Sequence, residues 1–354
     1  MTLMKFWQGK KVLITGHTGF KGGWLSLWLQ SLHAEVVGFS LTPPTTPNLF
    51  TAANISQGMT SIIGDIRDYS ALSRVLSEYK PEIVIHMAAQ PLVRYSYAEP
   101  VETYATNVMG TVHLLEAIRQ VGSVKVVVNV TTDKCYENKE WQWGYREIDR
   151  LGGHDPYSNS KACSELVTAA YRNSYFHDLH ISLASARAGN VIGGGDWAQD
   201  RLIPDIIRAC LNKQSVSIRN PNAVRPWQHV LEPLSGYLLL AQRLHESPTE
   251  YNESWNFGPN DDDVKPVNWI ATEVVNYLDN AKNWALDKSS HPHETGYLRL
   301  ECAKAKSKLG WQPRWNLEKG LKETVNWYQA YHLQKNMRDI TLDQIKHFME
   351  TTSE

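Results

Sequence analysis

Tyr157 and Lys161 are two residues whose types and spacing are suited to proton transfer. They lie four positions apart in a segment whose later part, 162–169, has helical apolar periodicity, and Pro156 suits the first turn of such a helix. Both side chains would then lie on one helical face. Because an ammonium group beside a phenol favours the phenolate, Lys161 is expected to lower the pKa of Tyr157. Tyr157 is therefore a candidate acid–base group.

A second polar group, Thr132, Asp133 and Lys134, follows the apolar run 124–130. That run is short, continuous and β-branched, which predicts a buried parallel strand. Carboxyl, amine and hydroxyl groups at its end are suited to further proton transfer. Neighbouring residues of a strand point to opposite faces, so Asp133 and Lys134 can share a site only if the chain turns there.

A glycine-rich turn, with Gly16, Gly19 and Gly22 at intervals of three, joins a predicted strand to a predicted helix near the start of the chain. Glycines there permit a tight turn and close approach of a pyrophosphate to the helix N-terminus, although a simple tight turn is the alternative. The turn also contains His17, Phe20 and Lys21. His17 and Lys21 would either add positive charge near the phosphates or lie on a solvated loop.

Further candidate cofactor contacts follow other predicted strands. Ser40 stands where an acidic residue commonly holds the ribose 2′-hydroxyl, and no arginine near it would favour a 2′-phosphate, so NAD is preferred to NADP. The remaining candidates lie after the next two strands or in the long helix expected at 100–121: Asp65, Ile66, Ala88, Ala89, Gln90 and Asn107.

Strand and helix patterns alternate as far as residue 188, which predicts an α/β fold with a doubly wound parallel sheet. Such sheets bind ligands at the carboxyl ends of their strands. Beyond Arg187 the pattern loosens. We expect a Rossmann-type domain of residues 1–188 that also receives about 229–260, and a smaller substrate domain formed by 189–228 and 261–354. A helix is expected at 229–244, and the tail 339–349 is expected to form a helix on the surface or on a neighbour.

Three arginines, Arg201, Arg219 and Arg225, fall near loops of the second half. A guanidinium fork matches the oxygens of a diphosphate, although a solvated charge is the equally weighted alternative for each of them.

Composition points to an ordinary globular protein: 42% of its 354 residues are apolar, 21% are charged, and the net charge is −1. That charge gives no reason to expect a nucleic acid or an anionic membrane as partner. Four scattered cysteines suggest neither a metal site nor a disulfide framework. The polar start of the chain and the lack of an apolar run of ~20 residues predict neither a secretion signal nor a membrane span. We therefore expect a cytoplasmic protein.

Several of these motifs together resemble the extended short-chain dehydrogenase/reductase family over nearly the whole chain. The residues that carry the resemblance are Gly16-x-x-Gly19-x-x-Gly22, Tyr157-x-x-x-Lys161, the stretch 187–191, and Leu309-Gly310-Trp311-x-Pro313 with the stretch 317–321. Within the family, Thr132-Asp133 is similar to the nucleotide-sugar 4,6-dehydratases, whose next residue is usually Glu rather than Lys134. The stretches 132–138, 19–22 and 47–50 are similar to the branch that acts on CDP-glucose and supplies the 3,6-dideoxyhexoses of lipopolysaccharide.

The resemblance implies an NAD-dependent lyase that forms CDP-4-dehydro-6-deoxyglucose. Tyr157, assisted by Lys161 and Thr132, would take the proton of the C4 hydroxyl, and Asp133 would protonate the departing C6 hydroxyl. Lys134 is the candidate base at C5, with water as the alternative. The residues implied for substrate binding are Asn190, Arg201, Arg219, Arg225 and His229. The family also implies a homodimer or homotetramer built on the helices around 100–121 and 156–176.

Three alternatives remain at this point. One is a nucleotide-sugar 4-epimerase, which shares the fold and the Tyr/Lys pair but has small, non-ionising residues at positions 133 and 134. A dehydratase acting on another nucleotide-linked glucose is the second. The third is a regulatory NAD-binding module without turnover, which the presence of both Tyr157 and Lys161 disfavours.

Overall fold

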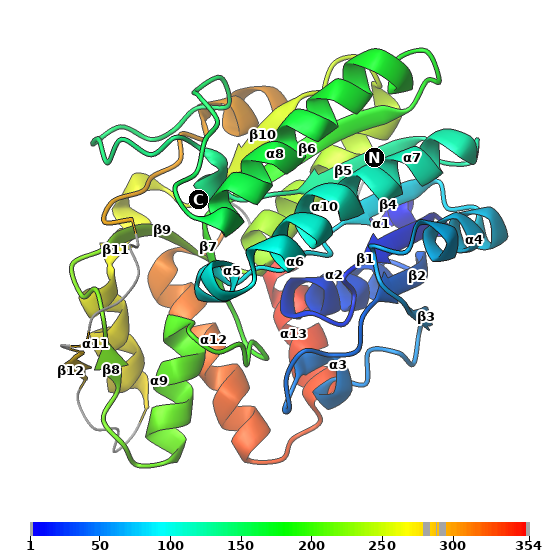
Figure 1. Cartoon of the computed structure of the whole chain (residues 1–354). Helices are drawn as coiled ribbons and strands as arrows, with labels where there is room; N and C mark the ends of the chain where they lie inside the picture. Colours follow the sequence, from blue (N-terminus) through cyan, green and yellow to red (C-terminus); the bar gives the residue numbers. More distant parts are fainter. Residues whose placement is uncertain (1–2, 279–283, 288, 290–294, 352–354) are drawn as a thin grey trace.

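The computed structural model describes residues 3–278, 284–287, 289 and 295–351. Its centre is a parallel seven-stranded sheet in the order β10-β6-β5-β4-β1-β2-β3 (Figure 1). The strands are β1 (Lys11–Thr15), β2 (Glu35–Ser40), β3 (Thr60–Ile63), β4 (Ile83–His86), β5 (Val126–Val130), β6 (Ser182–Ala188) and β10 (Ser254–Phe257). This confirms the predicted α/β class with a doubly wound sheet.

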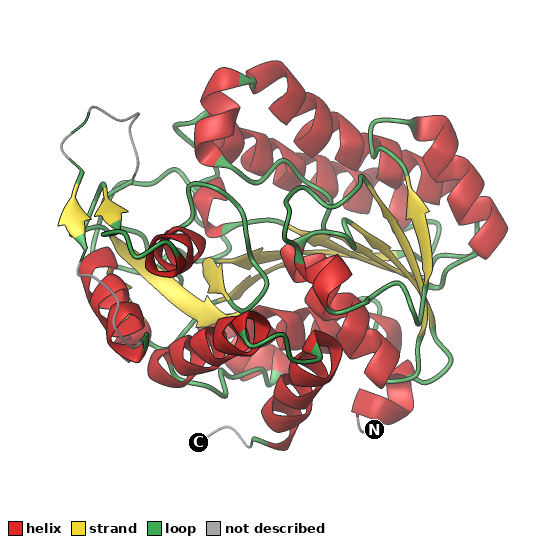
Figure 2. Ribbon diagram, turned by 90° about the horizontal axis from the view of Figure 1, so that it is seen from below, coloured by secondary structure: helices red, strands yellow, loops and turns green. Residues whose placement is uncertain are grey.

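Alternate side chains of the sheet enter two separate cores. On β1, Val12 and Ile14 join one apolar cluster, whereas Leu13 joins the other. Because both faces are covered, β4, β5 and β6 are buried along their whole length, and β6 carries the buried polar residues Ser185 and Arg187. Helices lie above and below the sheet in Figure 2. One face is covered by α2 (Phe20–Ser31) and α10 (Leu231–Glu246), and the other by α4 (Tyr69–Tyr79), α7 (Gly110–Gln120) and α8 (Pro156–Tyr171).

The order of the strands reverses between β1 and β4, because the chain runs outward through β2 and β3 on one side and through β5 and β6 on the other. A parallel sheet opens a crevice at such a point, beyond the carboxyl ends of its strands. Smaller elements stand beside this edge. They are β7 (Asn190–Ile192), β8 (Ser217–Ile218), β9 (Val224–His229), β11 (Val264–Pro266), β12 (Ala285–Leu286), α9 (Leu202–Leu211), α11 (Val267–Tyr277) and α12 (Leu317–His332).

One predicted boundary is wrong. The helix expected to begin at residue 229 begins at Leu231, because His229 ends strand β9, which pairs with β7 and β11. The long helix expected at 100–121 is present as three consecutive segments, α6 (Pro100–Tyr104), the π-helical η1 (Ala105–Met109) and α7. The remaining short elements are α1 (Leu3–Trp7), α3 (Leu49–Ala52), α5 (Val93–Ala98), η2 (Asp133–Cys135), η3 (Arg172–Phe176), η4 (Asp261–Asp263) and η5 (Ala305–Leu309).

The C-terminal helix α13 (Met337–Glu350) packs against α2, the helix that follows β1 and the glycine-rich turn. The ring of Phe348 meets that of Trp28 edge-on at 5.6 Å, and Arg338 donates a hydrogen bond to Gln30. The tail helix predicted from the sequence is therefore anchored on the same chain. No helix in the described part of the chain combines the length and the apolar character that crossing a bilayer requires.

Candidate active site

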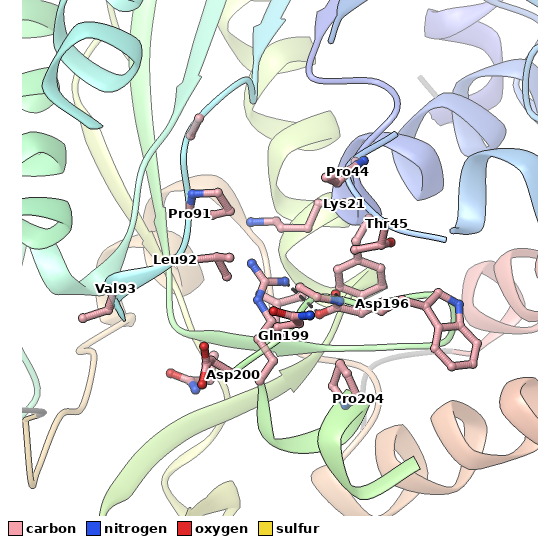
Figure 3. Close-up of a pocket in the computed structure, with 18 of the residues that line it drawn as sticks. Lys21, Pro44, Thr45, Pro91, Leu92, Val93, Asp196, Gln199, Asp200 and Pro204 are labelled. Carbon is pink, nitrogen blue, oxygen red and sulfur yellow. Dashed lines mark hydrogen bonds and ion pairs between the residues drawn. The ribbon is translucent and has the colours of Figure 1, made fainter. Parts of the chain in front are cut away.

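A cavity of about 1530 Å³ lies at the carboxyl ends of β1, β4 and β5 (Figure 3). A pocket for one drug-sized ligand typically measures ~300–1000 Å³, so this cavity has room for a dinucleotide and a second ligand together. It is lined by the glycine-rich turn, by the loops after β2, β4 and β5, and by the stretch 188–205.

The glycine-rich turn forms one wall of the cavity and requires glycine at specific positions. Gly16 has φ +81°, and a Cβ atom there would lie 2.8 Å from the backbone nitrogen of Ala88. A Cβ on Gly22 would overlap the carbonyl of Gly16. The turn leads directly into the N-terminus of α2, whose free amide groups attract phosphate. This close backbone approach fits a pyrophosphate.

His17 does not carry out its predicted role as a positive charge at the phosphates. Its ring lies against Gly38, and Nε2 is 2.7 Å from the hydroxyl of Ser61. Burial lowers the pKa of His17 to about 4, so the ring is neutral at pH 7. Its position predicts a packing role behind the turn, which corrects the expectation from the sequence.

Lys21 lines the cavity, and its side chain also contacts helix α10. Its Nζ donates a 3.0 Å hydrogen bond to the hydroxyl of Tyr237 on α10. Burial, together with the positive charges of Lys161 and Arg201, lowers the pKa of Lys21 to about 7. From its position in the sequence, Lys21 was expected to add a positive charge near the phosphates. In the structure, Lys21 titrates near neutrality.

The other predicted cofactor contacts divide into two groups. Ser40, Asp65, Ile66, Ala88 and Ala89 line the cavity, as do Gly16, Gly19, Phe20 and Gly22 of the turn. Gln90 and Asn107 stand behind its wall, where the backbone N–H of Gln90 donates to Asn107 Oδ1 at 2.9 Å and Asn107 Nδ2 donates to Ser160 at 2.9 Å. Asn107 therefore ties the loop after β4 to helix α8, and its role is one of positioning.

The chain turns immediately after β5. This turn is the condition that the sequence analysis set for Asp133 and Lys134 to share a site. Residues 133–135 form the 3₁₀ turn η2, which brings Lys134 Nζ to 3.7 Å from Asp133 Oδ1. The same oxygen accepts a 3.0 Å hydrogen bond from Thr132. Asp133 is fully buried, and its Oδ2 has no hydrogen-bond partner among the described residues. Thr132 and Lys134 line the cavity, with Asp133 behind them.

Tyr157 and Lys161 also line the cavity, from helix α8. The side chain of Asp155 caps this helix by accepting from the N–H of Ser158 at 2.9 Å. Lys161 Nζ donates to the carbonyl of Val130, 3.2 Å away, and so binds the helix to the end of β5. The predicted lowering of the tyrosine pKa is wrong for this arrangement. Burial raises the pKa of Tyr157 to about 12, although a hydrogen bond with Thr132 opposes the rise, and burial lowers the pKa of Lys161 to about 8.

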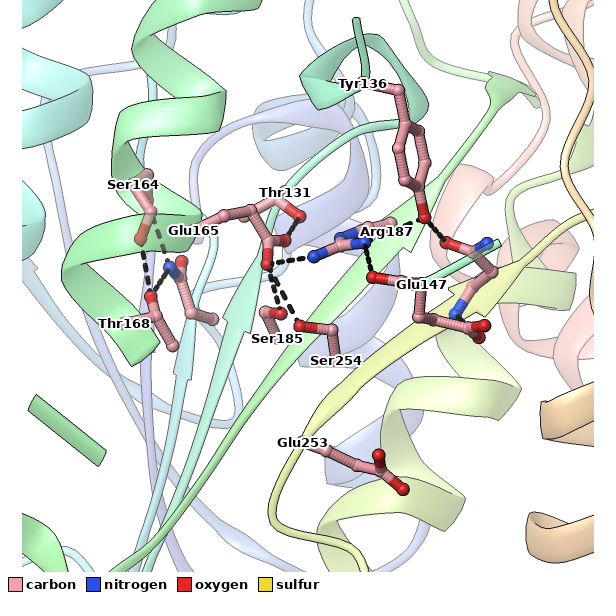
Figure 4. A network of polar contacts seen from close by, with 12 residues as sticks. Thr131, Tyr136, Glu147, Ser164, Glu165, Thr168, Ser185, Arg187, Glu253 and Ser254 are labelled. Carbon is pink, nitrogen blue, oxygen red and sulfur yellow. Dashed lines mark hydrogen bonds and ion pairs between the residues drawn. The ribbon is translucent and has the colours of Figure 1, made fainter. Parts of the chain in front are cut away.

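A buried polar network centred on Glu165 was not predicted from the sequence (Figure 4). Glu165 lies one turn after Lys161 and accepts hydrogen bonds from Thr131, Ser185 and Arg187, the last at 2.8 Å. The Arg187–Glu165 pair is almost completely buried. Through it α8 is joined to β5 and β6. The spacing of Glu165 from Lys161, four residues on a predicted helix, was the available signal.

The predicted substrate residues are not all at the cavity. Asn190, Arg201, Arg219 and Arg225 line it. The side-chain oxygen of Asn190 is buried and has no hydrogen-bond partner within the described residues. His229, in contrast, is packed between the rings of Trp24 and Trp315, and burial lowers its pKa to about 3. The prediction that His229 contacts the substrate is therefore wrong, because the residue lies in the core.

All three predicted arginines have partners in the protein itself, and Arg219 donates to Asp200 Oδ1 at 2.7 Å. Arg201 donates to the buried carboxylate of Asp196 at 2.7 Å. Arg225 donates to the backbone carbonyls of Val224 and Thr295. Arg94 and Asp200 also line the cavity and were not predicted as site residues. Among the described residues, no three His, Cys, Asp or Glu side chains form a group that could hold a metal ion.

Comparison with known proteins places this site in a family. Residues 13–324 match the family model of GDP-mannose 4,6-dehydratase. The chain belongs to this family of nucleotide-sugar 4,6-dehydratases. Among members of the family, the chain is 55% identical over 353 residues to CDP-glucose 4,6-dehydratase of Salmonella typhimurium, with 98% of both chains covered. It is 26% identical over 337 residues to dTDP-glucose 4,6-dehydratase of Xanthomonas campestris, covering 89% of this chain and 92% of the relative.

Solved structures show the same fold. The dTDP-glucose 4,6-dehydratase of Bacillus anthracis in complex with NAD superposes with a TM-score of 0.76 at 24% identity, covering 92% of this chain and 99% of that one. The UDP-glucose 4-epimerase of Thermotoga maritima with UDP-glucose gives 0.80 at 24% identity, covering 91% and 99%. Dehydratases and epimerases thus share this architecture, and the residues of the site must distinguish them.

Proposed function

We propose that this dehydratase converts CDP-D-glucose into CDP-4-dehydro-6-deoxy-D-glucose and water, with NAD as a cofactor that is regenerated in each turnover. The observation that carries the proposal is the meeting of two acid–base sets at one cavity. Tyr157 and Lys161 form the first set. Thr132 and Lys134 form the second, with Asp133 directly behind them and in contact with both. The 55% identity to a CDP-glucose 4,6-dehydratase supports the choice of substrate.

The glycine-rich turn, Ala88 and Ala89 fit the pyrophosphate and nicotinamide side of NAD because they leave the backbone uncovered. When bound there, NAD supplies the acceptor for a hydride from C4 and the donor that returns it to C6. The hydroxyl of Ser40 bonds to that of Thr18 at 2.8 Å, and neither group carries a charge that would attract a 2′-phosphate. We therefore propose NAD rather than NADP.

We assign each proton transfer of the reaction to a residue of this chain. Tyr157 takes the proton of the C4 hydroxyl, and Thr132, its hydrogen-bond partner, orients that hydroxyl. The C4 ketone acidifies the C5 proton, which Lys134 removes. Asp133 is the acid that we assign to the C6 hydroxyl as water leaves, and its buried Oδ2 has no hydrogen-bond partner among the described residues.

A 4-epimerase is the second candidate because its solved structures have the same fold. Epimerisation at C4 needs no proton transfer at C5 and no acid at C6. Asp133 and Lys134, whose Oδ1 and Nζ atoms lie 3.7 Å apart, supply groups for these two transfers, which favours the dehydratase.

The decisive experiment is incubation of the protein and NAD with CDP-, UDP- and dTDP-glucose in parallel. We expect a 4-keto sugar, detected by its absorbance in alkali, to form fastest from CDP-glucose, with the Tyr157→Phe variant as the inactive control. Faster turnover of another nucleotide would contradict the base assignment. A C4 epimer in place of a ketone would contradict dehydration itself.

We further propose that residues 1–188 with 229–260 form the cofactor domain and that 189–228 and 261–354 hold the substrate.

We also propose a cytoplasmic homodimer, or a dimer of dimers, that buries the exposed side chains of Val101, Met109 and Leu166 on the α6–α7 and α8 faces. Analytical ultracentrifugation of wild type and Leu166→Glu tests this, since a charge in the interface should shift the protein to monomer.

A further inference from the structure

The backbone of Tyr157 is held on both sides by buried serine hydroxyls. Its N–H donates to Ser96 Oγ at 3.1 Å, and its carbonyl accepts from the hydroxyl of Ser160 at 2.7 Å. Both serines are completely buried. The ring of Tyr157 extends from this backbone toward the cavity, so the two hydrogen bonds limit where its phenol can lie.

The first amides of helix α8 show what Ser96 contributes. Pro156 has no N–H, and the side chain of Asp155 accepts from the N–H of Ser158. The N–H of Tyr157 is one of the first four amides of the helix, which have no acceptor within the helix itself. Ser96, 61 positions earlier in the chain, supplies this acceptor. A residue of another element therefore completes the start of the catalytic helix.

The two serines differ in the elements to which they belong. Ser160 lies on α8 itself and accepts from Asn107 Nδ2, whereas Ser96 lies on the separate short helix α5. The start of α5 forms part of the cavity wall, where Leu92 and Val93 are drawn in Figure 3. The hydroxyl of Ser96 donates to the carbonyl of Val93 at 2.6 Å. One hydroxyl thus connects a residue of the cavity wall to the backbone of Tyr157.

We propose that Ser96 is a positioning residue for the dehydration, which fixes the backbone of Tyr157 and couples the place of its phenol to helix α5. The inference rests on the proposed function, since it takes Tyr157 as the group that accepts the C4 proton. A sugar nucleotide that contacts the wall at residues 92–94 then acts on the position of Tyr157 through this one serine.

The first test is hydrogen exchange of the Tyr157 amide in the protein without substrate, followed by NMR. Ser96→Ala removes the acceptor of this amide, so we expect exchange to become roughly fivefold faster or more. This readout does not depend on which nucleotide sugar the enzyme prefers. Faster exchange supports the inference even if another nucleotide is the better substrate, and an unchanged rate overturns it.

The second test separates positioning from a role in the wall alone. In Ser96→Ala, kcat with the best nucleotide sugar should fall roughly tenfold or more, because proton transfer requires a well-placed base. The affinities for NAD and CDP, measured by calorimetry, should remain those of wild type. A change confined to KM would make Ser96 a wall residue only and would overturn the inference.

A double variant tests whether Ser96 acts through Tyr157. In the Tyr157→Phe background, Ser96→Ala should cause no further loss of the residual turnover, because no phenol hydroxyl remains to be positioned. Losses that multiply in the double variant would show an effect independent of Tyr157 and would overturn the inference. Full turnover in Tyr157→Phe alone would instead contradict the proposed function.

The matched control is Ser182→Ala on β6. Ser182 is also buried and donates to the carbonyl of Leu244, away from the residues that line the cavity. This variant should lose thermal stability without losing kcat, and an equal loss of kcat would assign the effect of Ser96→Ala to stability. Ser96→Cys serves if Ser96→Ala does not fold. Sulfur is a weaker acceptor, so intermediate exchange and turnover are expected, and wild-type values of both would overturn the inference.

Discussion

The pKa values of Tyr157 and Lys161 are shifted in opposite directions, and that of Lys161 moves toward neutrality. Burial raises the pKa of Tyr157 to about 12 and lowers that of Lys161 to about 8. At pH 7 the phenol is therefore protonated while Lys161 is mostly charged. Tyr157 then acts as a base only while further positive charge or a hydrogen-bond donor stands against it, and the oxidised nicotinamide of bound NAD carries such a charge.

Replacement of the tyrosine hydroxyl tests its role directly. Tyr157→Phe keeps the ring in its buried position and should reduce turnover by roughly 10²–10⁴-fold, the usual contribution of a general acid–base group. NAD affinity, measured by fluorescence titration, and the thermal unfolding midpoint should remain those of wild type. Near wild-type turnover would remove Tyr157 from the mechanism.

Lys134 lines the cavity, and its Nζ lies 3.7 Å from Asp133 Oδ1. We expect Lys134→Met to retain NAD binding and slow C4 oxidation but to stop exchange of the C5 proton with deuterated solvent, followed by NMR. The matched control is Lys139→Met, because Lys139 is an exposed lysine paired with Glu137. If C5 exchange continues unimpaired in Lys134→Met, another group or water is the base.

Residue chemistry could be predicted from the sequence where it depends on local spacing. The four-residue spacing of Tyr157 and Lys161 predicted that they share a helical face. The spacing of Gly16, Gly19 and Gly22 predicted a tight turn between a strand and a helix. The direction of a long side chain could not be predicted, because it depends on distant partners. Lys21 turns toward Tyr237, 216 positions away, and Arg94 meets Asp200, 106 positions away.

At the scale of elements, helix α8 is joined to the sheet by charge as well as by packing. Glu165 accepts from Thr131 on the β5 side and from Ser185 and Arg187 on β6, all within the protein interior. Burial lowers the pKa of Lys161, and the negative charge of Glu165 opposes that effect. The network therefore sets both the position of the catalytic helix and the charge of its lysine.

Glu165→Gln should show both effects. Leaving the Arg187 charge uncompensated should lower the free energy of unfolding by about 3–5 kcal/mol, measured by urea denaturation. The pKa of Lys161 should fall below about 8, so the alkaline decline of kcat should move to lower pH. Glu253→Gln, which removes a surface partner of Lys304, is the control. A loss of stability without any shift of the pH profile would leave Glu165 with a structural role only.

Helices and strands with a clear hydrophobic pattern were predictable from the sequence. Elements that depend on pairing with distant strands were not. Strands β1, β2, β4 and β5 are mostly apolar runs, and the tail helix has regular apolar spacing. Strand β9 contains Arg225, Pro226 and Gln228 and has no clean alternation. It is a strand because β7 and β11 pair with it on its two sides. The helix that follows was therefore predicted two residues too early.

For the molecule as a whole, buried histidines make stability depend on pH. Burial lowers the pKa values of His17, His86 and His229 to about 4, 3 and 3, against about 6.5 in the unfolded chain. As the pH falls below about 6.5, the unfolded chain takes up these protons and the folded protein does not, so acid favours unfolding. Burial raises the pKa of Glu232 to about 7. Between about pH 7 and 4.5 the folded protein therefore binds one proton that the unfolded chain does not, and this offsets one of the histidines.

We therefore expect the free energy of unfolding to fall between about pH 6.5 and 5, by about 1.4 kcal/mol per pH unit for each net proton. Urea denaturation across this range measures the slope. His86→Asn should reduce it by one proton, whereas His177→Asn, at an exposed position, should leave it unchanged. A slope that is the same in wild type and His86→Asn would show that His86 is not a source of the acid sensitivity.

The contact between α13 and α2 has a consequence for synthesis of the chain. The indole of Trp28 donates to the sulfur of Met349, 321 positions later. A ribosome adding ~5–20 residues per second takes on the order of tens of seconds to cover that distance. Throughout this interval the nascent first βα unit, which carries the glycine-rich turn, lacks the helix that covers it. A chain stalled before Met337 therefore displays the apolar surface around Trp28, a surface of the kind that chaperones bind.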